Sequence, residues 1–278
     1  MNRIVTILVI AVTIGVGGYL GIPELTKMAG LQPDFHAPDL PAQGRRAVVI
    51  STSHSTLGEG DGKSTGVASL ELTGPYYTFL SSGMDVDLAS IDGGSIPIDP
   101  QTLNWPMVRS LDKRFQSDPV ALAKAADSIA IDDLDFTDYD IVYIAGGWGA
   151  AYDLAVSDRL GEGVSEAWIN DAVVATVCHG ALGLLKATDE DGRPLVEGRR
   201  VTGVTDKAIE ELGITETPWH PERDLRGAGA IFEAQSGFND IFTGIVVVDG
   251  RLVSGQNQNV SEETAYRAMQ VMLDLPSD

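Results

Sequence analysis

The segment "VVATVCHGALGLL" (residues 173–185) combines a strand pattern, a turn and a helix pattern, and it decides the fold. Its first five residues are a short apolar run of the kind found in strands buried on both faces. The following "HGALGLL" is typical of a helix start. Between them lies Cys178, the only cysteine among 278 residues. A sharp strand-to-helix turn holds such a side chain exposed beside free backbone N–H groups, so the segment predicts a nucleophile turn in an α/β protein.

The same alternation of strand and helix patterns extends along the chain. Strand-like runs occur at 47–53, 84–90, 139–147, 171–178, 199–205 and 244–256, and helix-like segments at 66–82, 158–170 and 261–274. This order predicts a mostly parallel sheet with helices on both sides. Within the last run, Asp249 and Gly250 separate two apolar stretches and predict a hairpin. Residues 46–278 are therefore expected to form one domain, with an inserted, cap-like segment at about 97–136.

Charge and cysteine content exclude several classes of function. The net charge is −21 and the isoelectric point is about 4.4, which disfavours nucleic acid or anionic lipid as a partner. A single cysteine rules out an internal disulfide. His36, His54 and His220 lack the spacing of metal ligands, so neither a metal nor another cofactor is expected.

The first 23 residues suggest a membrane segment. Arg3 precedes an uncharged run up to Pro23, close to the roughly 20 residues that span a bilayer. We expect a retained single-pass helix, with a cleaved, secreted signal as the alternative. Because the cationic flank precedes the run, the domain is predicted to lie outside the cytoplasm, in the periplasm, or to be secreted after cleavage. Residues 24–45 are predicted to be a linker.

The cysteine turn has two neighbours that suit catalysis. The start of a helix favours the thiolate, which predicts a lowered pKa for Cys178. His179 offers an adjacent imidazole as a base, and Gly180 removes a side chain that would crowd the turn. A small buried cysteine at a strand end is an equally good interpretation of these three residues alone.

Two further segments carry candidate site residues. After the run at 139–147, Gly147 can bring a backbone amide to a ligand oxygen, with the His179 amide as the second donor of an oxyanion hole. Taken alone, that turn is more typical of an ordinary connection. Glu71 lies in an apolar helix-like segment, and no Lys or Arg occurs from 64 to 90. Its carboxyl therefore either faces solvent or has a raised pKa in a pocket.

Taken together, these segments resemble the ThiJ/PfpI superfamily, which has the class I glutamine amidotransferase-like fold. Within it they resemble the glyoxalase III-like, heat-shock chaperone-like branch. The resemblance covers about residues 48–272 and rests on five segments: "TGVASLELTGPYYTF", "DYDIVYIAGGWGAAYDL", "VVATVCHGALGLL", "DGRPLVEGRRVTGVTD" and "VVVDGRLVSGQN". It implies a flavodoxin-like three-layer sandwich with a nucleophile elbow.

The resemblance also implies a chemistry. Cys178 would be the nucleophile, His179 the neighbouring base and Glu71 the acid touching the thiol, with Gly147 and His179 as oxyanion donors. Trp148, Gly149 and Gly180 would border the pocket. The implied reaction converts methylglyoxal or a similar 2-oxoaldehyde to a 2-hydroxy acid without glutathione, metal or other cofactor. The binding partner would be this small aldehyde, and whether the protein forms a homodimer is left open.

Two positions depart from the family pattern. Trp148 stands where many relatives have histidine, which changes the polarity of the pocket. The acid that orients the histidine in relatives is replaced by Ala208 or Ile209, leaving Asp206 or Glu210 as candidates. A cysteine amidase or peptidase on the same elbow remains an alternative, as does a non-catalytic chaperone or oxidative-stress sensor.

Overall fold

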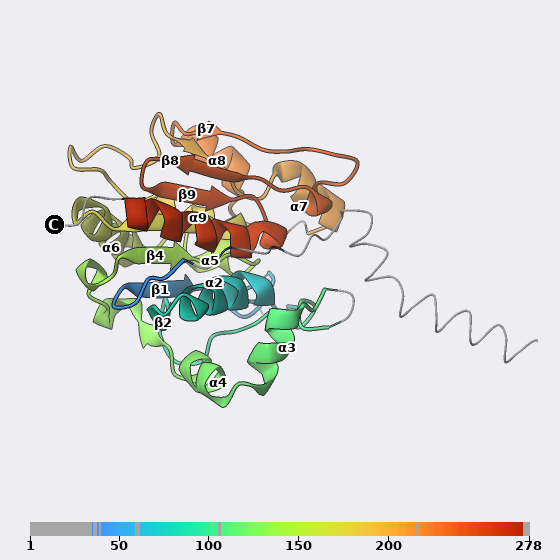
Figure 1. Ribbon diagram of the computed structural model, residues 1–278. Coiled ribbons are helices and arrows are strands. Elements are labelled where there is room, and N and C mark those ends of the chain that lie inside the picture. The colour runs from blue at the N-terminus through green and yellow to red at the C-terminus, as the bar shows by residue number, and fades with distance from the viewer. Residues whose placement is uncertain are drawn as a thin grey trace, which may run out of the picture. The chain divides into compact units, whose positions relative to one another are not determined.

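A seven-stranded, mostly parallel sheet lies at the centre of the described part of the protein (Figure 1). The computed structural model describes residues 35, 38, 40–58, 62–104, 107–214 and 216–274. The strand order is β3-β2-β1-β4-β5-β9-β8, with only the β8–β9 pair antiparallel. The strands are β1 (Arg46–Ser51), β2 (Asp85–Ser90), β3 (Ile129–Ala130), β4 (Ile141–Ile144), β5 (Val173–Val177), β8 (Val246–Asp249) and β9 (Leu252–Gly255). The predicted fold is confirmed.

Helices cover both faces of this sheet because its central strands are apolar on successive residues. The helices α2 (Ser69–Ser81) and α9 (Ser261–Asp274) pack side by side on one face, and α6 (Asp158–Ile169) packs on the other. Along β1, Val49 belongs to the core under α2 and α9, whereas Val48 belongs to the core under α6. β4 and β5 alternate in the same way, so the sheet separates two hydrophobic cores.

Shorter elements connect these layers. They are α3 (Ser110–Ser117), α4 (Pro119–Ala126), η1 (Ile131–Asp133), η2 (Phe136–Asp138), α5 (Ala150–Asp153), η3 (Cys178–Leu184), β6 (Arg200–Val201), α7 (Asp206–Leu212), α8 (Pro221–Gly227), β7 (Ile231–Phe232), η4 (Asp240–Phe242) and η5 (Gln258–Val260). Here η denotes a 3₁₀ helix. The turns that carry the site follow β4 and β5, at the carboxyl ends of parallel strands, where ligands bind in open α/β sheets.

The segment predicted as an insertion, 97–136, contains α3, α4 and the edge strand β3. Asp118 starts α4 because its side chain accepts hydrogen bonds from the amides of Val120 and Ala121, and Pro119 follows as the first helical residue. β3 pairs in parallel with β2. The segment thus extends one edge of the sheet, and its early residues reach the cavity described below. That it is an insertion stays a prediction.

One predicted strand differs from the structure. The run at 199–205 forms only the two-residue strand β6, which pairs with β7 outside the central sheet. The predicted hairpin explains why, because β9 pairs with β5 and occupies that position. The 199–205 segment instead attaches at the side, where the Thr202 amide donates to Ser254 Oγ at 2.9 Å. Gly250 turns the hairpin with a φ of 60°.

The predicted localisation requires a correction. The anchor at 1–23, like most of the predicted linker at 24–45, lies outside the described residues. Among the helices that the structure does describe, none is long and apolar enough to cross a membrane. The longest of them, α9, has 14 residues, against the roughly 20 needed for a span. The described structure thus gives no support to the predicted membrane-anchored, extracytoplasmic localisation, which is corrected accordingly.

Candidate active site

Cys178 occupies a strained backbone position at the turn from β5 into η3. Its φ is 57°, and within the described residues Asp171 is the only other non-glycine residue with a positive φ. Such a conformation costs on the order of 1–3 kcal/mol and is typical of functional sites. Gly180 makes the turn possible, because a Cβ there would lie 2.2 Å from the Ile144 carbonyl oxygen. The predicted sharp turn is confirmed.

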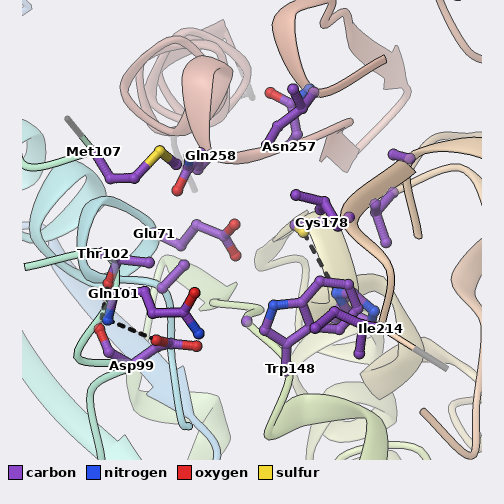
Figure 2. A pocket seen from close by; sticks show the side chains of 17 residues that line it. Glu71, Asp99, Gln101, Thr102, Met107, Trp148, Cys178, Ile214, Asn257 and Gln258 are labelled. Carbon is purple, nitrogen blue, oxygen red and sulfur yellow. Dashed lines mark hydrogen bonds between the residues drawn. The ribbon is translucent and has the colours of Figure 1, made fainter. Parts of the chain in front are cut away.

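Glu71 points at this cysteine from the neighbouring helix (Figure 2). It lies in the first turn of α2, and only 1% of it is exposed. Burial raises the pKa of its carboxyl to about 8, although hydrogen bonds with Cys178 and the amides of Gly146 and Gly147 oppose the rise. The Gly146 amide donates to Oε2 at 3.0 Å. Glu71 is therefore largely protonated at neutral pH.

The thiol of Cys178 and the carboxyl of Glu71 titrate as a coupled pair. Burial raises the pKa of the Cys178 thiol, and the charge of an ionised Glu71 raises it further, whereas the amides of His179 and Gly147 lower it. This direction is opposite to the lowered pKa predicted from a helix start. When Glu71 holds a proton, however, the repulsion disappears and its O–H can donate to a thiolate. Since both pKa values are raised, Glu71 and Cys178 each hold a proton near neutral pH, and the carboxyl proton lies beside the sulfur.

His179 contacts the sulfur but has no acid behind it. Its Nδ1 lies 3.5 Å from Cys178 Sγ, and its ring tilts against Trp148 with centroids 4.7 Å apart. Burial, and then the charge of His220, lower the pKa of His179 to about 3. Nε2 is buried and has no hydrogen-bond partner in the structure. A neutral imidazole therefore stands beside the thiol.

The predicted third member of a triad is not found at His179. Ala208 and Ile209 are buried on α7 and belong to an apolar cluster that packs against Trp148 and Cys178. Asp206 instead contacts His220, with Oδ1 3.0 Å from Nδ1. Glu210 is exposed. The family's acid position is thus filled by apolar side chains.

His220 is the residue that sequence reasoning missed. It precedes α8, which packs against η3, and this packing brings its imidazole close enough to influence the pKa of His179. Nothing in the sequence near residue 220 indicates that this imidazole lies near His179, because its position depends on how α8 packs against the nucleophile turn.

The glycine turn after β4 places backbone amides around the thiol. An atom at the Cβ position of Gly146 would lie 2.7 Å from the amide nitrogens of both His179 and Gly180, and 2.6 Å from Glu71 Oε2. The Gly146 amide donates to Glu71, the His179 amide interacts with Cys178, and the Gly147 amide interacts with both side chains. That the amides of Gly147 and His179 act as oxyanion donors stays a prediction.

A cavity of about 210 Å³ opens onto Cys178. Trp148 lines it, whereas Gly149 and Gly180 are not among the lining residues. A Cβ on Gly149 would lie 2.6 Å from the His54 carbonyl oxygen, so the absence of a side chain lets Gly149 pack closely against the backbone of residue 54. The lining residues are Ala68, Glu71, Asp99, Gln101, Thr102, Met107, Gly147, Trp148, Cys178, His179, Val204, Ala208, Leu212, Ile214, Ile241, Asn257 and Gln258. In the described parts of the chain, no group of three acidic, His or Cys side chains is arranged to hold a metal.

The raised pKa of Glu71 should make stability depend on pH. The folded protein holds this proton up to about pH 8, whereas the unfolded chain releases it near 4.5. Between these values the folded state binds more protons, so the free energy of unfolding should fall as pH rises, by at most about 1.4 kcal/mol per pH unit. Urea unfolding of wild type and Glu71→Gln from pH 5 to 8 measures this, and the variant should show the flatter dependence. Parallel curves would contradict a buried, protonated Glu71.

Comparison with known proteins gives the family. The DJ-1/PfpI family profile matches residues 64–270. Glutathione-independent glyoxalase HSP31 of Saccharomyces cerevisiae is 29% identical over 236 residues, which cover 82% of this chain and 98% of that protein. Rapid Encystment Protein 24 kDa of Francisella tularensis has a TM-score of 0.76 and 26% identity over 82% of this chain and 99% of its own. Glyoxalase III of Candida albicans has a TM-score of 0.75 and 26% identity, covering 82% and 97%. The chain belongs to the DJ-1/PfpI family.

Proposed function

We propose that this protein is a glutathione-independent glyoxalase, which converts methylglyoxal or a similar 2-oxoaldehyde to a 2-hydroxy acid. The observation that carries the proposal is Cys178, held at a positive φ at the end of a cavity and facing a protonated Glu71. The relatives from Saccharomyces cerevisiae and Candida albicans are named as glyoxalases of this kind, which supports it.

The reaction balances without an external oxidant or cofactor. The thiolate of Cys178 adds to the aldehyde carbon and forms a C–S bond, while the carbonyl electron pair moves to oxygen and gives a hemithioacetal. A base then removes the proton from that carbon, and a proton is delivered to the adjacent keto carbon. The first carbon is thereby oxidised to a thioester and the second reduced to an alcohol. Water finally cleaves the C–S bond and releases the hydroxy acid and the thiol.

Glu71 is the better candidate for the proton transfers. Its pKa of about 8 lies near the working pH, where a group both gives and takes a proton readily. His179, with a pKa of about 3, is too weak a base to hold the thiol proton, so its Nδ1, 3.5 Å from Sγ, would orient the thiol instead. The amides of Gly147 and His179 would stabilise the oxyanion of the hemithioacetal.

The amidase or peptidase alternative has less support. A cysteine hydrolase uses an imidazolium that an acid orients and stabilises. Here Nε2 of His179 lacks a partner, and burial opposes its positive charge. No specific contact favours the chaperone or sensor alternative over chemistry at the same thiol.

Lactate formation from methylglyoxal tests the proposal directly. The purified protein is incubated without glutathione and with a chelator, and lactate is quantified enzymatically. We expect turnover although glutathione is absent and metal ions are chelated. Absence of lactate from methylglyoxal, and of the corresponding 2-hydroxy acids from larger 2-oxoaldehydes, would refute the proposed function and leave the non-catalytic alternatives.

Replacing Glu71 by Gln should lower turnover by at least about tenfold, because the amide cannot carry the proton between the two carbons. Gln has the same shape and can still accept from the Gly146 amide, so the fold should persist. Steady-state kinetics on methylglyoxal provide the measurement, and circular dichroism of the variant provides the control. Unchanged kcat in a folded Glu71→Gln protein would remove Glu71 from the reaction.

A further inference from the structure

The cavity at Cys178 has two chemically different sides. The side that includes Glu71 also carries polar residues from 97–104 and from the segment after β9. An apolar wall also lines the cavity and consists of Trp148, Val204, Ala208, Leu212, Ile214 and Ile241, while Ala68 and Met107 are apolar lining residues outside this wall. In Figure 2, Trp148 and Ile214 lie beside Cys178 on the side away from Glu71. A substrate whose aldehyde reaches the sulfur would therefore place its substituent either among polar groups or against this apolar wall.

Two of the polar groups, Asp99 and Asn257, already have partners within the protein. Asp99 accepts hydrogen bonds from Thr65 Oγ1 at 3.1 Å and from the Gln101 amide at 2.9 Å. Asn257 donates to the carbonyl of Thr243, and its Oδ1 accepts from the Asn259 amide at 3.0 Å. A polar substituent placed at Asp99 or Asn257 would therefore compete with existing hydrogen bonds, whereas an apolar substituent would lose nothing at an apolar wall.

The apolar wall includes Ala208, which occupies the position where a triad acid was sought. Ala208 is buried together with Val204 and Ile209, and this cluster packs against Trp148 and Cys178. A methyl group stands where a carboxylate would have made the surroundings of the thiol polar. Leu212, which follows on the same helix, lines the cavity and is 42% exposed, so the apolar surface continues to the outside.

Charge in the cavity excludes anionic substrates. Among the described residues that line it there is no Lys or Arg, and the ionisable groups include Asp99 and Glu71. The imidazole of His179 is neutral near pH 7. A carboxylate or phosphate on the substrate would lose its hydration without gaining a partner of opposite charge.

The size of the cavity also favours a substrate with a larger apolar substituent. The cavity of about 210 Å³ is far larger than the roughly 10–15 Å³ needed to hold a single water. Methylglyoxal, whose substituent is one methyl group, would leave most of the apolar wall uncovered. A larger apolar substituent would remove that wall from water.

We propose that this cavity selects neutral 2-oxoaldehydes that carry an apolar substituent larger than methyl. The inference rests on the glyoxalase chemistry proposed above, and the bond changes are the same: with phenylglyoxal the product is mandelate. Trp148, Leu212 and Ile214 are the residues that set this preference, because they line the apolar side of the cavity.

Four substrates compared on the wild-type protein test the preference. They are methylglyoxal, hydroxypyruvaldehyde, phenylglyoxal and 4-carboxyphenylglyoxal, with each hydroxy acid product quantified by chromatography. We expect kcat/KM for phenylglyoxal to exceed that for methylglyoxal by at least about tenfold, since even a single methylene in an apolar pocket changes it by 10–200-fold. The 4-carboxy group should abolish this gain in kcat/KM, and kcat/KM for hydroxypyruvaldehyde should not exceed that for methylglyoxal.

A matched pair of variants assigns the preference to the wall. Ile214→Asn should reduce the phenylglyoxal-to-methylglyoxal ratio of kcat/KM by at least about fivefold. Ile231→Asn, the same change at an exposed isoleucine on β7 that does not line the cavity, should leave the ratio unchanged. Equal or lower kcat/KM for phenylglyoxal in wild type would overturn the inference while leaving the glyoxalase function intact. No product from any of the four would instead remove the function on which it rests.

Discussion

Replacing Cys178 by alanine should abolish the conversion of methylglyoxal to lactate, with a loss on the order of 10⁴-fold or more. The reaction needs a covalent bond to the aldehyde carbon, and neither His179 nor Glu71 can form a hemithioacetal in its place. Alanine has a Cβ like cysteine, so the strain at a φ of 57° is retained and the fold should persist. Lactate production by equal amounts of wild-type and variant protein gives the comparison.

The Cys178→Ala experiment also separates the competing functions. A hydrolase would lose esterase or amidase activity in the same variant, while a chaperone would keep its suppression of aggregation. Circular dichroism and thermal unfolding confirm that the variant is folded. Lactate formation above about one hundredth of the wild-type rate would show that the thiol is not the nucleophile, because loss of a nucleophile normally costs far more.

Replacing Gly147 by alanine should cause a large loss of stability, about 2–5 kcal/mol. Two penalties add there. The φ of 89° is costly for any residue with a Cβ, and the added atom would lie 2.4 Å from both the Ala68 amide nitrogen and the Gly66 carbonyl oxygen. Backbone atoms cannot move aside as a side chain can. The turn would have to open, and the oxyanion donor at 147 would shift with it.

Gly192→Ala is the matched control for Gly147→Ala. Its φ of 76° imposes a similar backbone penalty, but an added Cβ would meet nothing within 4 Å. Urea unfolding should therefore show a loss of only about 1–2 kcal/mol for the control. Equal losses in the two variants would show that the close packing of the turn against residues 66–68 contributes no stability.

Most of the fold could be predicted from local sequence. Apolar runs on successive residues predicted the central strands because both faces of the sheet are covered. Asp249 and Gly250 predicted the hairpin because a positive φ is required at that turn. The run at 199–205 was misassigned, since its apolar residues do pack inward but the hairpin holds the neighbouring place in the sheet. Which strand pairs with β5 is a long-range property that periodicity does not contain.

The structure brings the candidate residues Glu71, Cys178 and His179 together, whereas their electrostatics were harder to predict. The absence of cations near Glu71 left open whether its carboxyl faces solvent or has a raised pKa, and burial in the structure raises the pKa. For Cys178 the helix start suggested a lowered pKa, but burial and the nearby carboxyl outweigh the backbone amides. The influence of His220 on His179 could not be foreseen, since it arises only when α8 docks on η3.

The left-handed backbone at residue 178 places selection for folding and selection for chemistry in opposition. Glycine, the residue that tolerates this conformation best, would relieve the strain at the tip of β5 but would remove the only thiol in the chain. A lineage selected for heat resistance alone would drift away from cysteine there. One selected for turnover must keep it and hold the turn in place by packing elsewhere, as the two hydrophobic cores do. Thermostabilised descendants of this chain should therefore gain their stability far from the elbow.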